Sequence, residues 1–69
     1  MELKEVKIQM ALAKPVIYKN AQCIIKELIL WHDGKEFKYS ANLQEVANKN
    51  VNYRVNINDI SIDKYINTV

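Results

Sequence analysis

The side chains that could act as nucleophiles are few in this chain. Its single cysteine, Cys23, and its single histidine, His32, form the pair that nucleophilic catalysis would need. Such a pair works only if the two side chains lie within hydrogen-bond reach of each other. If both residues lie on one straight strand, they are ~30 Å apart. The strand interpretation therefore excludes a Cys–His catalytic pair, and Cys23 is expected to be a small buried or half-buried apolar residue.

The chain also has too few residues of the types that metal and phosphate sites require. One histidine and one cysteine cannot provide the three or four ligands of a zinc site without carboxylates from elsewhere. His32 and Asp33 next to a turn are typical of a solvated hairpin tip. The only glycine, Gly34, is needed by that turn, so no glycine-rich loop can hold a phosphate. We therefore expect no enzymatic activity, no cofactor and no metal site.

The composition is that of one small globular domain spanning residues 1–69. About half of the residues (49%) are hydrophobic and 26% are charged. No apolar run approaches the ~20 residues of a membrane span, and the residues from Met1 to Glu5 lack the apolar region of a secretion signal. A lone cysteine cannot form an internal disulfide, which favours the reducing cytoplasm. We expect a cytoplasmic domain with no membrane partner.

Alternation of apolar and polar residues predicts two strands, in segments 35–43 and 51–57. Before the first of them, Asp33 and Gly34 favour a two-residue type I′ turn with positive φ at Gly34. This turn would place Leu30 opposite Phe37, so that residues 21–32 form a long strand of the same hairpin. The apolar residues of all three segments then share one face, and they are the expected core: Ile24, Leu28, Leu30, Phe37, Tyr39, Leu43, Val55 and Ile57.

Two segments allow a second interpretation. Residues 21–32 also fit a helix that Asn20 would cap and Gly34 would end. We favour the strand because the hairpin explains both of its halves together. Residues 1–14 fit either a strand or a short helix. The helix would leave Ile8 and Leu12 on its polar side, so the strand is the favoured interpretation there too.

The remaining segments complete a chain made mainly of strands. The only proline, Pro15, suits the start or edge of a strand. Residues 47–50 form a turn by composition, and residues 58–60 form a tight turn before a short strand at 61–63. This order resembles that of SH3-like barrels, in which a 3₁₀ turn often precedes the last strand. The resemblance covers roughly residues 15–63 and implies a fold without implying an activity.

The expected fold is therefore mainly β. It is a small SH3-like barrel of about five short antiparallel strands, preceded by a strand or short helix and followed by a tail at residues 64–69.

The second face of the long strand is too apolar for a solvated surface. Besides Cys23 it carries Ile25, Ile29 and Trp31. Residues 1–14 could cover this face, a curled barrel could enclose it, or it could be an exposed patch for a partner. In the third case Ile25, Ile29 and Trp31 are the expected partner-binding residues, with Trp31 as the anchor. The partner would be another protein or a second copy of the chain.

Nucleic-acid binding is the alternative function. Lys35, Lys38 and Arg54 lie on or beside strands near aromatic residues, as in small barrels that bind nucleic acids. However, the net charge is only +2, and acidic residues alternate with these basic ones. We therefore expect a small non-catalytic binding module for protein–protein interaction or self-association. Its size and its many residues with AT-rich codons suit an accessory protein of a low-GC bacterium or of its phage.

Overall fold

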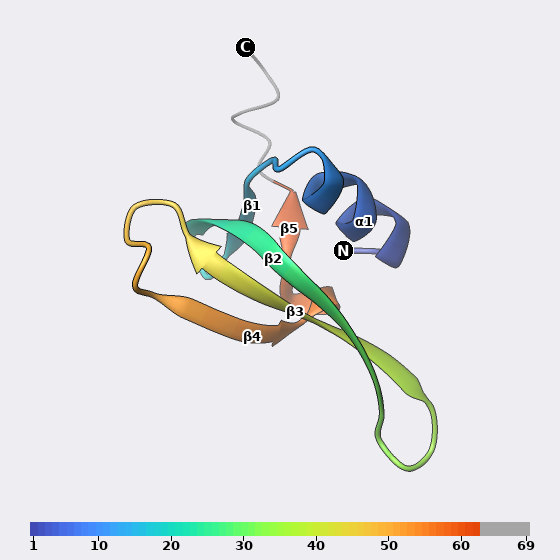
Figure 1. Ribbon diagram of the computed structural model, residues 1–69. Helices are drawn as coiled ribbons and strands as arrows, with labels where there is room; N and C mark the ends of the chain where they lie inside the picture. The colour runs from blue at the N-terminus through green and yellow to red at the C-terminus, as the bar shows by residue number, and fades with distance from the viewer. Residues whose placement is uncertain (63–69) are drawn as a thin grey trace.

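The computed structural model describes residues 1–62, which form one curved antiparallel sheet and one helix (Figure 1). The sheet has the strand order β4-β3-β2-β1-β5 and is not closed by a ladder between β4 and β5. The expected mainly β architecture is confirmed. Asp63, which we placed in the last strand, and the tail at 64–69 lie outside the described residues. The elements are α1 (Leu3–Ala11), β1 (Val16–Tyr18), β2 (Ala21–His32), β3 (Phe37–Glu45), β4 (Asn52–Asn56), the 3₁₀ turn η1 (Ile57–Asp59) and β5 (Ser61–Ile62).

The N-terminal segment is a helix, so the favoured strand interpretation of residues 1–14 is wrong. A capping box starts α1, in which the Glu2 N–H donates to Glu5 Oε1 over 3.2 Å. Val6 is fully buried, whereas Ile8 and Leu12 are simply exposed. The helix is held at its start, because the amino group of Met1 donates to carbonyl oxygens at both ends of the 57–60 segment, at 2.9 and 3.1 Å.

A tight two-residue turn does occur, but it joins β1 to β2. Tyr18 pairs with Ala21, which leaves only Lys19 and Asn20 in the loop. Both have left-handed backbone conformations, with φ of 48° and 66°. A type I′ turn requires positive φ at both central residues. Asparagine is a frequent residue in this conformation, whereas lysine adopts it at a cost.

The β2–β3 hairpin has a longer tip than the predicted two residues. His32 pairs with Phe37, so residues 33–36 lie outside the ladder. The predicted positive φ of Gly34 is confirmed at 98°. The predicted register is wrong by two residues, because Leu30 pairs with Tyr39 and not with Phe37. A shift by two keeps the side chains of residues 28–32 on their predicted faces.

A β-bulge in β2 changes which side chains reach the core. Ile25 pairs with Leu43 and Glu27 pairs with Asn42, so Lys26 between them has no partner. The extra residue puts Ile25 on the same face as Leu28, although the two are three positions apart. This reverses the prediction for the first part of the strand. Ile25 is buried, and Ile24, an expected core residue, is only half-buried.

The core lies between the concave face of the sheet and α1. Of the predicted core residues, Leu43, Val55 and Ile57 are buried, and Leu28 and Tyr39 pack partly buried against the cluster. The complete buried apolar cluster is Val6, Val16, Cys23, Ile25, Ala41, Leu43, Val55, Ile57 and Ile60.

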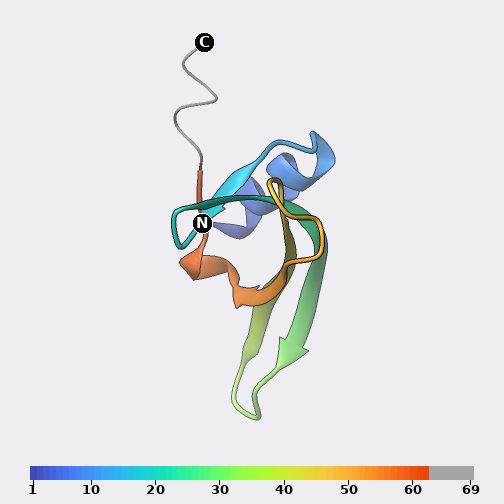
Figure 2. The same cartoon turned by 90° about the vertical axis from the view of Figure 1, so that its left-hand side faces the viewer.

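Two predicted core residues are exposed: Leu30 (54%) and Phe37 (68%). Both lie on the core side of the sheet, but the hairpin extends past the last β3–β4 pair, Ser40 with Asn56. We call this projecting part, residues 30–39, the arm. Figures 1 and 2 both show the arm pointing away from α1 and from the body of the sheet. The assignment of Leu30 and Phe37 to the core is wrong, because β4 is too short to cover these two side chains.

Candidate interaction surface

The three predicted partner-binding residues do not form one surface patch. Ile25 is 3% exposed and belongs to the core cluster, which also contains Val6 of α1. Ile29 is half-buried and Trp31 is 37% exposed, both on the opposite face of the sheet. The physical reason is the bulge at Lys26, which turns Ile25 inward. Ile25 is therefore not on the second face of the strand, which keeps Ile29 and Trp31.

Trp31 is held against the sheet by a hydrogen bond. Its indole Nε1–H donates to Ser40 Oγ over 2.8 Å, and Ser40 is buried. Ser40 is the ladder partner of Ile29, so the indole leans along the outer face over the neighbouring pair. This bond satisfies the polar group of Trp31. About a third of the side chain remains exposed, in a fixed orientation.

Two of the three predicted nucleic-acid-binding residues share a sheet face. Lys38 and Asn42 lie on the same side of β3, and Arg54 of β4 pairs with Asn42. Lys35 lies apart, exposed at the tip of the arm. Lys38 Nζ is 3.0 Å from Asp33 Oδ2, so its charge is already compensated.

A shallow hollow of about 490 Å³ lies on this outer face. Its lining is mainly amide and charged side chains, and the Asn42 amide donates to Glu27 Oε1 over 3.2 Å. The acidic residue therefore lies within the basic face. The lining residues are Lys26, Glu27, Asn42, Gln44, Asn52, Tyr53 and Arg54.

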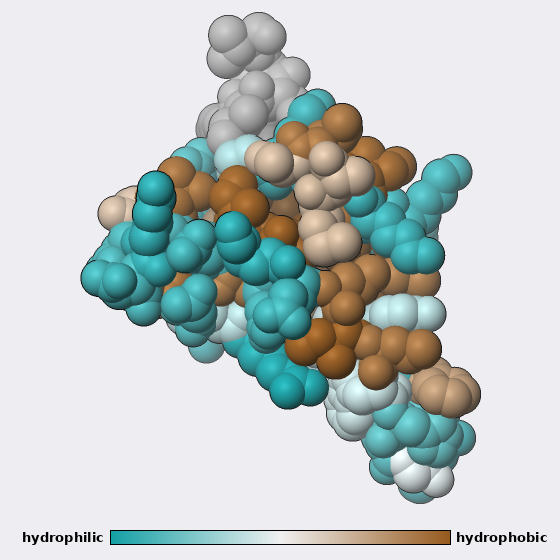
Figure 3. Space-filling view, in the orientation of Figure 1, coloured by the Kyte–Doolittle hydropathy of each residue, from teal (hydrophilic) through white to brown (hydrophobic). Residues whose placement is uncertain are grey.

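The arm carries the exposed apolar residues that the sequence prediction placed in the core. Leu30 and Tyr39 form one cross-strand pair on its inner face, and His32 and Phe37 form the next. The two rings of the second pair meet edge to face with centroids 4.8 Å apart. Figure 3 shows apolar surface gathered where β2 enters the arm. A sequence signal existed, because the strand predicted at 51–57 is shorter than the strands predicted at 21–32 and 35–43.

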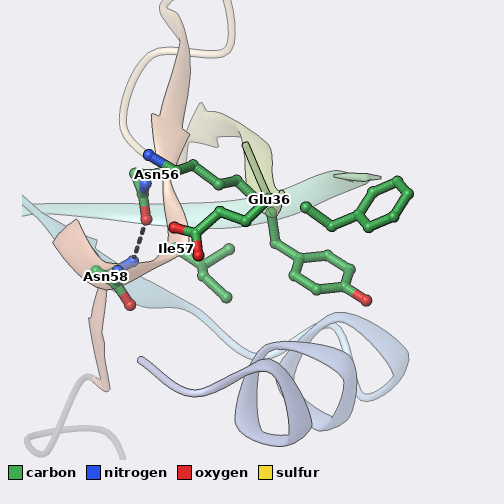
Figure 4. Close-up of a pocket in the computed structure, with 7 residues that line it drawn as sticks. Glu36, Asn56, Ile57 and Asn58 are labelled. Carbon is green, nitrogen blue, oxygen red and sulfur yellow. Dashed lines mark hydrogen bonds between the residues drawn. The ribbon is translucent and has the colours of Figure 1, made fainter. Parts of the chain in front are cut away.

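A second hollow, of about 370 Å³, lies between the arm and η1 (Figure 4). The Glu36 side chain extends from the arm toward η1, where the Asn58 N–H donates to Asn56 Oδ1 over 2.9 Å. The hollow opens beside residues 37–39 of β3, which have no β4 partner. It therefore lies where β3 presents an unpaired edge.

The arm tip is organised by one carboxylate. Asp33 Oδ1 accepts the backbone N–H groups of Lys35 and Glu36 at 2.7 and 2.8 Å. These two bonds, followed by Lys38, lower the pKa of Asp33 to about 2. The Gly34 N–H donates to His32 Nδ1 over 3.0 Å. His32 thus completes the tip, as expected for a hairpin end.

Cys23 lies in the core at the other end of the same strand. Its side chain is fully buried, and burial raises the pKa of the thiol, with a smaller contribution from Glu45. A raised pKa keeps the thiol protonated and unreactive. Both the predicted burial of Cys23 and its separation from His32 along one strand are confirmed.

Other kinds of site find no support within residues 1–62. No group of three or more His, Cys, Asp or Glu residues in this range could hold a metal ion. In the same range, no helix has the length and apolar character that crossing a membrane requires.

Comparison with known proteins found no protein similar to this chain. No protein-family model matches the chain, and neither a curated protein nor a solved structure matches it.

Proposed function

We propose that this chain is a small non-catalytic binding module that associates with protein through its arm. The partner is another protein or a second copy of the chain. The observation that carries the proposal is the exposure of Leu30 and Phe37, at 54% and 68%, on a hairpin that extends beyond the rest of the sheet. Large apolar side chains on a projecting element are typical of an interaction site.

The energetics of the arm support the same proposal. A two-stranded hairpin is marginally stable by itself in water, and a third strand or a packed face stabilises it. Burial of apolar surface contributes about 25 cal/mol per Å². Association over Leu30, Phe37 and the exposed part of Trp31 would therefore stabilise both the complex and the arm.

The architecture we propose for the module is an SH3-like barrel. The strand order β4-β3-β2-β1-β5 and the 3₁₀ turn before β5 support it. The lone cysteine supports a cytoplasmic setting. The size and the AT-rich codon bias of the composition support an accessory protein of a low-GC bacterium or of its phage.

Nucleic-acid binding is the second candidate. It is favoured by Lys38 and Arg54, which lie on one outer face of the sheet next to amide side chains. The ion pair of Lys38 with Asp33 and the presence of Glu27 on that face weaken it. Phosphate binding by so few uncompensated charges would be weak.

Photo-crosslinking in the cells that naturally make the protein separates the two candidates. A benzophenone side chain replaces Phe37 on the arm in one variant and Arg54 on the outer face in the other. We expect protein adducts from position 37 and few from position 54. Nucleic-acid adducts from position 54, or no protein adduct from position 37, would overturn the proposal.

A further inference from the structure

Within residues 1–62, three stretches of strand edge have no neighbouring strand. The outer edge of β5 is also free, but this strand has only two residues. The first is the outer edge of β4, which ends the sheet. The second is residues 37–39 of β3, beyond the last pair with β4. The third is the edge of β2 after Cys23, where the ladder with β1 ends. Unpaired edges of this kind are templates for an added strand.

The three edges differ in how well each could pair with the same edge of a second copy of the chain. Two identical antiparallel strands related by a twofold axis place their central residue opposite itself. On β4 that residue is Arg54, and on the free part of β3 it is Lys38. Like charges directly opposite each other destabilise a strand pair. Neither edge is suited to pairing with itself about its central residue.

The β2 edge is complementary to itself. Pairing of residues 28–32 about Leu30 puts leucine opposite leucine. On the outer face, Ile29 then lies opposite the Trp31 of the second copy, and Leu28 lies opposite His32 on the inner face. No charged side chain meets a like charge. The bulge at Lys26 limits the pairing at one end, and the tip at Asp33 limits it at the other.

The backbone of this edge is oriented for pairing. At the tip, the Asp33 N–H donates to the Glu36 carbonyl over 3.1 Å, which makes these two residues a hydrogen-bonded pair. Bonded and non-bonded pairs alternate along an antiparallel ladder. Trp31 is therefore bonded to Lys38, and the N–H and C=O of Leu30 point away from β3. They are available to a strand added at the β2 edge.

We propose that the occupant of this edge is a second copy of the chain, paired antiparallel along residues 28–32 and centred on Leu30. The two sheets join into one with the order β4-β3-β2-β2′-β3′-β4′. This inference rests on the proposed function, since it names self-association as the use of the arm. The exposed Leu30 and Trp31 then lie at the centre of the dimer.

Disulfide crosslinking of the purified chain tests the register. Leu30→Cys places two cysteines on the twofold axis with Cα atoms ~5.5 Å apart, within the roughly 4.4–6.8 Å that a disulfide spans. We expect complete oxidation to a covalent dimer. Phe37→Cys is the matched control on the same face of the arm, because its own copy lies at least three strand spacings, ~14 Å, away. It should stay monomeric on a denaturing gel, and the buried Cys23 remains in both variants.

A mixture of two further variants tests the offset pairing. Ile29→Cys and Trp31→Cys each place their own copies on a diagonal of roughly 7–8 Å, beyond disulfide reach. Mixed together, they bring the two cysteines directly opposite each other. We expect a disulfide in the mixture and little in either variant alone. Trp31 is partly exposed and Ile29 is half-buried. Circular dichroism of the reduced chains checks that both variants fold.

Sedimentation equilibrium completes the test. We expect a dimer for the wild type and at least a tenfold weaker association for Leu30→Lys, which places lysine opposite lysine. A dimer that crosslinks at Phe37→Cys but not at Leu30→Cys would overturn this pairing and leave the proposed function intact. A wild type that is monomeric at all concentrations would also overturn it, and photo-crosslinking at position 37 then decides the proposed function separately.

Discussion

Asp33 is the residue on which the geometry of the arm tip depends. Its carboxylate accepts two backbone N–H groups and contacts the Lys38 ammonium at 3.0 Å. A carboxylate that accepts backbone N–H bonds is stabilised in its charged form. The group that makes most of the bonds at the tip therefore has a charge that depends on pH.

We expect the carboxyl group of Asp33 to titrate with a pKa of about 2 in the folded chain, below the ordinary value of 3.8. Because the folded pKa is lowered, the contribution of Asp33 to tip stability is fully present above the ordinary value. It is lost as the pH falls through about 2. NMR titration of the side-chain carboxyl carbon measures this directly.

Lys38→Met is the control for that titration. The backbone N–H bonds are the largest cause of the lowered pKa and Lys38 is a smaller one. The variant should therefore raise the pKa of Asp33 only partly, leaving it below the ordinary value. A full return to 3.8 on loss of Lys38, or an ordinary pKa in the wild type, would contradict the described tip.

At the scale of secondary structure, the sequence predicted the elements whose signals are local. Strands β3 and β4, the turn after β3 and the 3₁₀ turn η1 follow from alternation and turn residues in short segments. The bulge at Lys26 has no such local signal, because it depends on which residues of β2 face Leu43 and Val6. Carrying one alternation through all of β2 therefore gave the wrong face for Ile24 and Ile25.

Deletion of Lys26 tests this account of the bulge. Without it, Glu27 alone separates Ile25 from Leu28, and simple alternation directs both inward. We expect the variant to fold cooperatively, with a thermal midpoint within a few degrees of the wild type. Deletion of Ile24 is the matched control, since it forces either Cys23 or Ile25 out of the core.

The Ile24 deletion should abolish cooperative unfolding or lower the midpoint by more than 10 °C, because it exposes a fully buried side chain. If both deletions lowered the thermal midpoint equally, the extra residue at Lys26 would not determine which side chains of β2 face the core. Circular dichroism during heating suffices for both variants.

The whole molecule consists of a packed body and an arm that contributes little to the core. The buried cluster combines α1, all five strands or their flanking residues, and η1, whereas the inner face of the arm has two large exposed side chains. Stability and association should therefore depend on different residues. Sequence alternation alone could not separate them, because both groups lie on the same face of the sheet.

Leu43→Ala and Phe37→Ala measure this separation. Leu43 is fully buried, so its truncation should cost ~2–5 kcal/mol of unfolding free energy. Phe37 is largely exposed, so its truncation should stay within about 0.5 kcal/mol. Both are compared by urea unfolding in the Leu30→Lys background, in which association is expected to be weakened. A large loss of unfolding free energy in Phe37→Ala would show that Phe37 is part of the core.

The candidate site was harder to predict than the fold for the same reason. Exposure of Leu30 and Phe37 depends on where β4 ends relative to the β2–β3 hairpin, and this is a relation between elements distant in sequence. The bulge at Lys26 removed Ile25 from the predicted patch and left Ile29 and Trp31 on the outer face. The length difference between the strands was visible in the sequence and points to an uncovered hairpin end.

The contact of the Met1 amino group with the carbonyls of Ile57 and Ile60 also bears on the order of events during synthesis. The ribosome adds roughly 5–20 residues per second, so α1 leaves the exit tunnel seconds before the segment that holds it. A nine-residue helix is marginal in isolation. Until residues 57–60 have emerged, α1 lacks the carbonyl oxygens that hold its start, and Val6 lacks the core neighbours Ile57 and Ile60.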